Sequence, residues 1–540
     1  MSHDYSSKTL EPSVPFFVGV IGHRQLRLEE IPRLQQEFDS YIKSLLSSLK
    51  VTKIIVLTGL AEGADRIPQA SQYREHFSIC AVLPLSKNEY VEDFPSKKER
   101  AAFDEALNQC EYRVLPADSP TGRISAKARE KAYQECARWI SDNSNLLIGF
   151  WDGMEPRGIG GTSETVTYRT SDPRTKILVH QRESEFLHIQ ASNGERNFKE
   201  DCKCSGHNIS GKQPIKFLDE LENLNGLIEP SKITPEYDQI KLFYNQFDAS
   251  ATALQKRFNR KTISLFVWAL LTLQFAFIQQ QTFSVLWLSL SAMAMMITII
   301  LWWTLWKSRI KSAYETFRFV AELLRIQIWW NECDLKINAI SDNVEYHDIR
   351  GFTYSLLKNI FAFSKISQSE SGLVNKQIKD KNHERLASKW IEDQIKYLIG
   401  SETKKGAIER NRIAAKRGLV FMIISLVLAG TIQIFSTVSS WLDVIQPGSV
   451  LDWSLKFLFP FLLSMAASMA AYAKLMGYRE VKILYDLKLR RLEIALEQLS
   501  LQDHKADWGT IVKSVGNASL TESLRWFQLK GDREIRPFHN

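Results

Sequence analysis

The chain has 540 residues, a net charge of +8 and a hydrophobic content of 44%. With a mean hydropathy of −0.20, this composition excludes a disordered chain, a collagen-like repeat and a small disulfide scaffold, and its average is that of a soluble protein. At about 100 to 200 residues per domain, the length predicts three or four domain-sized units. The six cysteines are thinly spread, and the start, MSHDYSSKTLEPS, has neither a basic stretch nor an apolar run. We therefore expect no signal peptide and a main soluble part that lies in a reducing cytoplasm.

Residues 14–190 alternate short apolar runs with helical stretches. Continuous Val, Ile and Leu runs of this kind indicate strands buried on both faces, and the intervening helices indicate that the strands are parallel. The candidate strands are 16–22, 53–59, 78–84, 145–151 and 176–180. We therefore predict a Rossmann-like α/β domain with a parallel sheet.

Three of these strands end in turns that are rich in glycine and in charged side chains. In an open α/β sheet, ligands bind beyond the carboxyl ends of the strands, where glycine allows close backbone approach and helix N-termini offer amide hydrogens to anions. Arg24 could pair with a phosphate, and His23 could contact a phosphate or a base. Asp65 or Glu62 could accept a hydrogen bond from a ribose hydroxyl. The candidate ligand contacts are Gly22, His23 and Arg24 in the first turn, Thr58, Gly59, Glu62, Gly63 and Asp65 in the second, and Gly160, Gly161, Thr162, Ser163 and Glu164 after the fourth strand.

Each turn taken alone also has a plain structural interpretation. A glycine after a strand is most often only a tight turn, Asp65 and Arg66 could form a local ion pair or cap, and His23 could be a structural histidine. The spacing matches neither the dinucleotide fingerprint GxGxxG nor the phosphate-loop signature GxxxxGK(S/T), which disfavours a standard dehydrogenase or ATPase. Three such turns together favour a ligand site, with residues 160–163 cradling a phosphate at the start of the next helix.

The segment after this domain carries weaker signals. Residues 191–234 are rich in Asn, Lys, Ser and Glu, which indicates a linker or an insertion. Cys202, Cys204 and His207 offer three soft ligands, but no second cysteine or histidine pair completes a zinc site. We expect a polar loop here, with neither a metal nor a cofactor.

Hydrophobic residues are concentrated farther on, in two pairs of uncharged runs. They are 263–278 with 283–306, and 418–435 with 457–473, of 16, 24, 18 and 17 residues. Three of these runs fall slightly short of the about 20 residues that a bilayer requires, so flanking Trp, Tyr, Lys and Arg must help at the interface. We predict two transmembrane hairpins, in modules 235–340 and 380–502. Buried hairpins of a soluble bundle are the alternative.

Lys and Arg flank these runs asymmetrically. The two linking loops, 279–282 and 436–452, contain no Lys or Arg. Basic segments lie at the other ends of the runs, at 255–261, 307–311, 409–417 and 474–482. By the positive-inside rule, both hairpin tips face outside and both termini lie in the cytoplasm. Much of the net charge of +8 is thus juxtamembrane charge that attracts anionic lipid, so membrane lipid is an expected partner and nucleic acid is not.

The two hairpins form a tandem repeat, in which a basic helix precedes and an amphipathic helix follows each pair. Apolar residues recur at three- and four-residue spacing over 312–330 and 477–499. These helices could simply pack on their neighbours, or they could be coupling and oligomerisation elements. A cytoplasmic tail, 503–540, contains an apolar helix around 520–529. The predicted second half is therefore an all-α domain of four transmembrane helices with long cytoplasmic helices.

The motifs of residues 14–190 resemble those of the SLOG superfamily. They are GHR after the first strand, TGLAEGAD after the second, LPLSKNEYVEDF at 83–94, and WDG followed by GIGGTSE. That superfamily also contains the LOG cytokinin-activating phosphoribohydrolases, the DprA DNA-uptake proteins and the ligand-sensing N-terminal region of TRPM channels. Residues 235–500 resemble tandem SLATT two-helix modules, through the hairpins and the AELLR sequence at 321–325. Such modules accompany SLOG domains in prokaryotic conflict systems.

The resemblance implies an antiphage-type effector of the bacterial inner membrane. Its SLOG domain would sense a nucleotide-derived second messenger through the turn residues given above, and its transmembrane module would permeabilise the membrane. It also implies a homo-oligomer and a signal-synthesising partner enzyme. The LOG motif PGGxGTxxE places its glutamate three residues after threonine, whereas Glu164 lies two residues after Thr162, and on a helix that offset turns a side chain by about 100°. Sensing is therefore favoured over hydrolysis.

Two alternative functions stay open. In one, a membrane-tethered LOG-like enzyme cleaves the N-glycosidic bond of a nucleotide, with Glu164 or Asp65 assisting. In the other, the chain is a TRPM-like ligand-gated cation channel. The four apolar runs contain no Asp, Glu, Lys or Arg, so a crude pore or bilayer disruption fits better than a charge-lined ion pathway.

Overall fold

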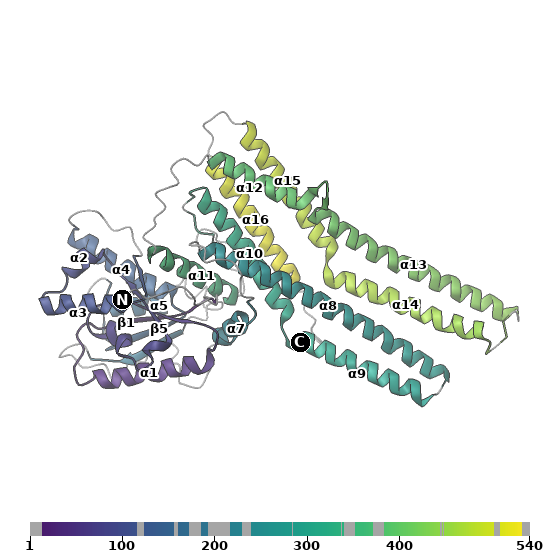
Figure 1. Cartoon of the computed structure of the whole chain (residues 1–540), viewed down its shortest axis with the longest axis horizontal. Coiled ribbons are helices and arrows are strands. Elements are labelled where there is room, and N and C mark those ends of the chain that lie inside the picture. Colours follow the sequence, from purple (N-terminus) through teal and green to yellow (C-terminus); the bar gives the residue numbers. More distant parts are fainter. Residues whose placement is uncertain are drawn as a thin grey trace, which may run out of the picture. The chain divides into compact units, whose positions relative to one another are not determined.

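A computed structural model of the protein describes residues 13–115, 124–155, 160–171, 185–192, 216–228, 239–282, 284–335, 337–339, 351–370, 383–442, 445–446, 448–501 and 508–531. The chain divides into two compact units (Figure 1). Unit 1 consists of residues 1–246 and 340–379, and unit 2 of residues 247–339 and 380–540. The chain therefore leaves unit 1 for unit 2, returns to unit 1 once, and leaves it again.

Unit 1 is built on a six-stranded sheet in which all neighbouring strands are parallel. In order across the sheet, the strands are β4 (Tyr112–Val114), β3 (Ser78–Val82), β2 (Ile54–Thr58), β1 (Phe16–Gly22), β5 (Leu146–Trp151) and β6 (Glu185–Gln190). Every residue of β2 and β5 is buried, which is why these strands are continuous apolar runs in the sequence. The predicted parallel sheet with intervening helices is confirmed.

Two strands differ from the prediction. Strand β4 has three residues, of which only Val114 is buried, so the sequence contains no apolar run to mark it. The predicted strand 176–180 lies outside the described residues. The sixth strand is instead β6, in which Phe186, Leu187 and Ile189 are buried.

Helices surround the sheet and complete its core. Residues Ile140 of α4 and Ile366 of α11 lie in one buried cluster with Phe17, Leu57 and Leu147 of the sheet. The helical elements of unit 1 are α1 (Ile31–Ser48), η1 (Gly63–Ala70), η2 (Arg74–His76), α2 (Lys87–Val91), α3 (Lys97–Asn108), α4 (Ala126–Asn143), α5 (Thr162–Ser171), α7 (Lys216–Asn225) and α11 (Gly351–Glu370).

Helix α7 lies within the segment 191–234, which was expected to be a linker or an insertion. Its last residue, Asn225, is 3% exposed. The Asn225 amide accepts from the Val14 N–H at 2.9 Å and donates to the Val14 carbonyl at 3.0 Å and to Thr52 Oγ1 at 2.8 Å. Val14 and Thr52 precede β1 and β2, so α7 belongs to the packed body of unit 1.

Helix α11 lies between the two apolar hairpins in the sequence, yet it is hydrogen-bonded to residues that directly precede two strands of the sheet. Asn359 Nδ2 donates to the Pro15 carbonyl at 2.8 Å and to Asn145 Oδ1 at 2.9 Å, and Asn145 Nδ2 donates back to Asn359 Oδ1 at 3.1 Å. Pro15 precedes β1 and Asn145 precedes β5. Helix α11 therefore belongs to unit 1 and is hydrogen-bonded to residues at the start of its sheet.

Among the residues that the structure describes, four helices are long and apolar enough to cross a membrane. They are α8 (Gln239–Thr282), α9 (Val285–Lys307), α13 (Ala407–Trp441) and α14 (Val450–Met476), with 44, 23, 35 and 27 residues. Helices α8, α13 and α14 extend beyond the three short apolar runs, so those runs do not set the length of the helices. At about 1.5 Å per residue, all four exceed the hydrocarbon thickness of a bilayer. These helices are compatible with a membrane protein.

The apolar surface of these four helices is largely uncovered within the chain. Only 11% of the most apolar 18-residue window of each helix is buried. A soluble bundle with buried hairpins would cover these windows with other parts of the protein. Exposed apolar surface of this extent points to an outside partner, either lipid or protein.

The two hairpins repeat one plan, which includes a break at the same place. Helix α10 (Ile310–Glu332) follows α9 after Arg309, whose φ is 47°, and α15 (Tyr478–Leu501) follows α14 after Gly477, whose φ is 62°. Both left-handed residues end an apolar helix and start an amphipathic one. The remaining elements are α12 (His383–Ile399), the two-residue strands β7 (Gly400–Ser401) and β8 (Lys404–Lys405), and α16 (Trp508–Gly531).

Candidate functional site

The candidate site of unit 1 starts where β1 and β5 lie side by side. The chain proceeds outward from β1 through β2 and β3 to β4, and then crosses back to β5 on the other side of β1. The carboxyl ends of two strands that diverge in this way are the usual ligand position in parallel sheets. Here those ends are the turns Gly22-His23-Arg24 and Trp151-Asp152-Gly153.

His23 and Asp152 join these two turns. The Asp152 N–H donates to His23 Nε2 at 3.0 Å, and Nε2 lies 3.2 Å from Asp152 Oδ1. The two residues are 9% and 1% exposed. Because Nε2 already faces Asp152, we infer that the His23 ring holds the two turns together. Asp152 was not among the predicted contacts, and its only signal in the sequence was the WDG motif.

Glycines allow the second turn to pack directly on the first. The Ala64 N–H donates to the His23 carbonyl at 3.1 Å. A Cβ at Gly22 would lie 2.3 Å from the Cβ of Ala64, and a Cβ at Gly63, whose φ is 77°, would lie 2.3 Å from the Arg24 carbonyl oxygen. No larger residue fits at either position without moving a turn.

Asp65 lies behind this contact, and its carboxylate faces the end of β2. Asp65 Oδ2 accepts from the Ala61 N–H at 3.3 Å, and Thr58 Oγ1 donates to the Asp65 carbonyl at 2.6 Å. A Cβ at Gly59 would lie 2.9 Å from Asp65 Oδ2. Burial raises the pKa of Asp65 to about 7, against the opposing effects of the Ala61 N–H, Arg24 and Arg66. Asp65 nevertheless keeps some exposed surface, so it is recessed but not sealed.

Arg24 is exposed and lies over an aromatic ring. Its Cζ atom is 5.1 Å from the centroid of the Tyr133 ring, which comes from α4. Burial alone would lower the pKa of Arg24, but Tyr133, Tyr90 and Asp65 raise it, so the guanidinium stays charged. An exposed guanidinium held over a ring is prepared for a phosphate or a carboxylate.

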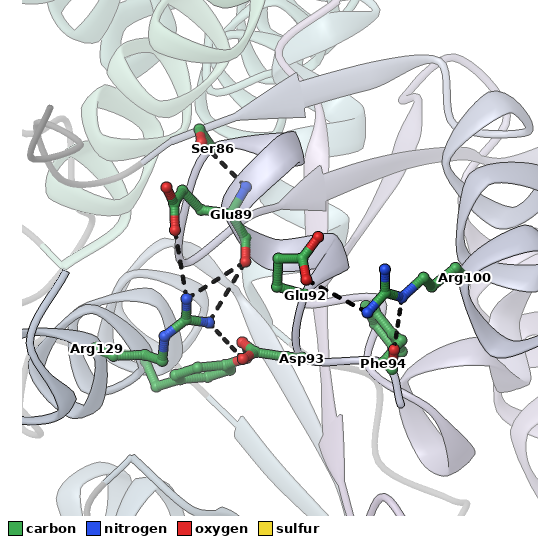
Figure 2. Close-up of polar contacts among 8 residues, drawn as sticks. Ser86, Glu89, Glu92, Asp93, Phe94, Arg100 and Arg129 are labelled. Atoms are coloured by element: carbon green, nitrogen blue, oxygen red, sulfur yellow. Dashed lines mark hydrogen bonds and ion pairs between the residues drawn. The ribbon is translucent and has the colours of Figure 1, made fainter. Parts of the chain in front are cut away.

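The position of Tyr133 is in turn set by the segment that follows β3. The Tyr133 hydroxyl donates to Asp93 Oδ2. Asp93 also pairs with Arg129, which contacts the carbonyl and the carboxylate of Glu89 (Figure 2). On the other side of this segment, Arg100 donates to the Phe94 carbonyl at 2.9 Å (Figure 2). Two arginines therefore hold residues 86–94 in place beneath the ring that carries Arg24.

Tyr90 connects the same segment to the end of β2. It is 1% exposed, and its hydroxyl donates to the Gly59 carbonyl at 3.1 Å. Its ring makes an edge contact with that of Tyr133 at a centroid distance of 5.9 Å. Glu62 lies beside these residues in the turn before η1, where it partly offsets the lowering of the pKa of Arg66 by burial.

The turn after β5 reaches the site through α4. Gly160 has a φ of 78°, and a Cβ there would lie 2.8 Å from the Gln134 nitrogen and 3.1 Å from the Tyr133 Cβ. The backbone of Gly160 thus lies against the residue whose ring carries Arg24. At the start of α5, Gly161 is exposed and Thr162 partly exposed, whereas Ser163 is 8% exposed. Residues 156–159 lie outside the described part of the chain.

Glu164 is occupied by contacts at the start of its own helix. Its Oε2 accepts from the Gly160 N–H at 2.6 Å, and its Oε1 accepts from Gln134 Nε2 and lies 3.6 Å from Arg138 Nη2. Glu164 therefore acts as a cap that ties the glycine turn to α4. The structure thus brings all three predicted turns into contact with one another or with Tyr133, a residue that the sequence did not single out.

No metal-binding group is apparent in the described part of the chain. Within the described ranges, no three His, Cys, Asp or Glu side chains cluster closely enough to hold a metal ion. Cys202, Cys204 and His207 lie outside those ranges. Cys80, Cys110, Cys136 and Cys333, the described cysteines, are not in disulfides.

Unit 2 contains a partly buried charge cluster around Glu322, the glutamate of the AELLR sequence. Glu322 pairs with Arg325 and, at 2.8 Å, with Arg318, which also lies 2.7 Å from Asp248 of α8. Burial alone would raise the pKa of Glu322, but Arg325, Arg318 and Lys488 of α15 lower it to about 2. The cluster therefore joins helices of both hairpin modules.

Comparisons of the chain with protein-family models, with curated proteins and with solved structures find no match.

Proposed function

We propose that the protein is a membrane-anchored effector. Unit 1 would sense a nucleotide-derived signal, and unit 2 would span the bacterial inner membrane and disrupt it or open a pore. The observation that carries this proposal is the meeting of three glycine turns around Arg24 at the carboxyl edge of a parallel sheet, in a chain that also has four uncovered apolar helices.

The chemistry of the unit 1 site suits a nucleotide. Arg24 on Tyr133 offers a fixed positive charge to a phosphate, and the exposed start of α5 at Gly161 and Thr162 offers backbone N–H groups. Asp65 offers a carboxyl group for a ribose hydroxyl. This combination also fits the Rossmann-like, SLOG-type domain that the sequence motifs resemble.

Sensing agrees better with the site than hydrolysis does. Glu164, the residue nearest in sequence to the catalytic glutamate of LOG enzymes, is held by Gly160, Gln134 and Arg138. A carboxylate that caps its own helix is not free to act on a ligand. Arg24, by contrast, could bind an anion while its guanidinium stays over the Tyr133 ring.

A membrane arrangement follows from the ends of the apolar helices. Near the break after α9, Trp303 and Trp306 are 47% and 51% exposed, and Lys307 Nζ lies 4.8 Å from the centroid of the Trp303 ring. At the tip of the second hairpin, between α13 and α14, Trp441 and Trp453 are 85% and 41% exposed. Exposed tryptophans at both ends are typical of the two interfaces of a bilayer, and the basic ends would lie in the cytoplasm with both termini.

One basic residue lies close to a tip. Lys456 is in the second turn of α14, where its Nζ is 2.9 Å from Asp452 Oδ2. The basic segments at the opposite ends of this hairpin, 409–417 and 474–482, contain several Lys and Arg residues, so a single lysine near the tip does not alter the proposed orientation.

Signal transfer would use the connections between the two units. Helix α11 is bonded to the residues before β1 and β5, and the chain on either side of it enters the two hairpin modules. The turns would have a resting and an active arrangement, and a ligand that binds the active one more tightly would act on both modules through these connections. The size of the effect is set by the difference between its affinities for the two arrangements. Assembly of several copies, and supply of the signal by a partner enzyme, complete the proposal.

Dye release from proteoliposomes tests this function. Full-length protein is reconstituted around a trapped dye, and candidate nucleotides are added one at a time. We expect one nucleotide class to cause release, Arg24→Ala to abolish it, and Arg113→Ala to leave it intact. Arg113 is a matched control because it is an exposed arginine on β4, three strands away from β1. Release that Arg24→Ala does not reduce would contradict the sensing role of the turns.

A nucleotide N-glycosidase is the second candidate, and the pKa of Asp65 favours it. A carboxyl group with a pKa of about 7 can exchange protons near neutral pH, as general acid–base catalysis requires. Incubation of the full-length protein with nucleotides should then release free base, and Asp65→Asn should stop the release. Nucleotide recovered intact, together with dye release, would instead favour sensing.

A further inference from the structure

Most hydrogen-bond donors of Arg66 have no acceptor. Arg66 lies in η1, which directly follows the second glycine turn, and it is partly exposed. A guanidinium carries several N–H donors in a fixed fork. In the described part of the chain, this side chain makes one hydrogen bond, from Nε to the Leu60 carbonyl at 3.4 Å, and no carboxylate is close enough to form an ion pair with it. Its Nη2 atom is buried without a partner.

A second arginine of unit 1 shows the contacts of a structural arginine. Arg74 also lies over a phenylalanine, with Cζ 5.6 Å from the centroid of the Phe77 ring. Its guanidinium donates to the carbonyls of Phe77 at 2.8 Å and of Gln109 at 2.6 Å, and it pairs with Glu111 at 2.8 Å. Arg66 has the same kind of ring contact without these polar contacts. Packing on a ring therefore does not account for Arg66.

Arg66 and Arg24 lie over rings of one aromatic cluster. Arg66 Cζ is 5.6 Å from the centroid of the Phe94 ring, and Arg24 lies over Tyr133. The ring of Tyr90 makes edge contacts with both rings, at centroid distances of 5.3 and 5.9 Å. The two guanidiniums are thus carried by neighbouring rings on the same side of the second turn.

Both guanidiniums also act on Asp65. Each lowers the pKa of its carboxyl group, but burial is the larger effect and raises this pKa to about 7. The carboxyl group is therefore partly protonated at neutral pH and offsets less than one positive charge. Burial lowers the pKa of Arg66, against the opposing effects of Glu62, Tyr90 and Asp65, but a guanidinium stays charged in proteins. The surroundings of Arg66 and Arg24 thus favour an anion.

A partly buried guanidinium with unused donors has lost hydration without gaining acceptors, which is unfavourable until a ligand supplies them. Phosphate oxygens fit the guanidinium fork especially well. We propose that Arg66 is a second phosphate contact of the unit 1 site, beside Arg24. It binds either the phosphate that Arg24 binds or a neighbouring phosphate of the same nucleotide. This inference rests on the nucleotide site proposed above, and it adds a residue for which the sequence suggested only a local ion pair or cap.

Thermal unfolding of the full-length protein in neutral detergent tests this role. Inorganic phosphate and inorganic pyrophosphate are titrated separately at constant ionic strength, and the saturable rise of the unfolding midpoint gives a half-saturating concentration for each. If both arginines hold one phosphate, Arg66→Gln raises this concentration about tenfold for both anions, the loss expected for one charge-assisted hydrogen bond. If Arg66 holds the neighbouring phosphate, the increase occurs with pyrophosphate only. No increase with either anion overturns the proposal.

Arg74→Gln is the matched control, because Arg74 has the same ring contact and its donors are occupied. It should change the half-saturating concentrations less than about twofold. Equal changes in the two variants would show a general effect of charge and would overturn the proposal. A purely structural role of Arg66 would lower the midpoint without added anion and leave the half-saturating concentrations unchanged. If Arg66→Gln does not fold, Arg66→Lys keeps the charge, loses the fork and should raise them about threefold.

The same titrations separate this proposal from the one on which it rests. Arg24→Gln should also raise the half-saturating concentration of inorganic phosphate about tenfold. An effect of Arg24→Gln without an effect of Arg66→Gln would leave the nucleotide site intact and remove Arg66 from it. A wild-type midpoint that neither anion raises would remove both.

Discussion

His23 Nε2 lies 3.2 Å from Asp152 Oδ1, and this contact joins the carboxyl ends of β1 and β5. The two residues are 129 positions apart in the sequence, and Asp152 is almost completely buried. The pair therefore lies in the middle of the sheet edge for which we propose nucleotide binding, and it holds the turn from which Arg24 projects.

Removal of the Asp152 carboxylate should destabilise unit 1 and weaken nucleotide binding together. Asp152→Ala keeps the N–H that donates to His23 but removes the buried carboxylate, so the Met154 N–H loses the acceptor that lies 3.0 Å away, which costs about 1–3 kcal/mol. Asp104→Ala is the control, because Asp104 is 46% exposed in a surface pair with Lys87 and should cost less than about 1 kcal/mol. Thermal unfolding and nucleotide titration of the full-length protein measure both effects. Equal losses in the two variants would mean that the buried pair has no special role.

The close packing of the first two turns predicts that a single methyl group at Gly22 is poorly tolerated. In Gly22→Ala the new Cβ would lie 2.3 Å from the Cβ of Ala64 and 2.8 Å from that of Phe150. We expect a loss of about 1–3 kcal/mol from overpacking, together with weaker nucleotide binding. Gly226→Ala places its Cβ 3.5 Å from the nearest atom and should be nearly neutral. Unchanged unfolding midpoints in both variants would show that the turns can separate freely.

The ring beneath Arg24 predicts a graded series at Tyr133. Tyr133→Phe keeps the ring and removes only the hydroxyl that donates to Asp93, so nucleotide affinity should fall by about threefold or less. Tyr133→Leu also removes the aromatic face, and a further loss of about threefold to tenfold is expected from the cation–π contact. Isothermal titration of the full-length protein gives both values. A Tyr133→Leu variant with wild-type affinity would show that the ring does not position Arg24.

The raised pKa of Asp65 predicts a pH-dependent stability with a defined sign. The carboxyl group titrates near 3.8 in the unfolded chain and near about 7 in the folded one. Between these values the folded state holds the extra proton, so the contribution of Asp65 to stability is fully present below pH about 4 and is lost as the pH rises to about 7. Asp65→Asn should therefore gain stability relative to the wild type across that window. Parallel unfolding-midpoint profiles of the two proteins from pH 4 to 8 would contradict the raised pKa.

The charge cluster of unit 2 predicts a large effect at Glu322. Glu322→Gln leaves Arg318, Arg325 and Lys488 in close proximity without their shared carboxylate, which should cost about 3–5 kcal/mol. Glu493→Gln, an exposed position on α15, should cost less than about 0.5 kcal/mol. The unfolding midpoint of the full-length protein in detergent measures the difference. A small effect at Glu322 would mean that water already solvates the cluster.

The sequence contains the main features of the site but not the residues that connect them. Arg24, Gly63 and Asp65 could be found because each lies in a turn directly after an apolar strand. Tyr133 could not, because an aromatic residue in the middle of a helix has the pattern of an ordinary core residue. Asp152 acquires its role only because β5 lies beside β1.

The same division holds for the architecture. Continuous apolar runs mark β1, β2 and β5, because strands that are buried on both faces need apolar side chains throughout. Uncharged runs mark the four long helices, because a helix with an uncovered apolar surface carries few charges along it. Helix α11 has no such mark, since the residues that Asn359 bonds, Asn145 and Pro15, lie far away in the sequence.

Local patterns were therefore enough to predict a parallel sheet, its three glycine turns and two apolar hairpins. The order of the strands decided which turns meet, and the packing of α4 decided that Tyr133 supports Arg24. The physical reason is that secondary structure depends on neighbours along the chain, whereas a binding site depends on side chains that long-range packing brings within a few ångströms of one another.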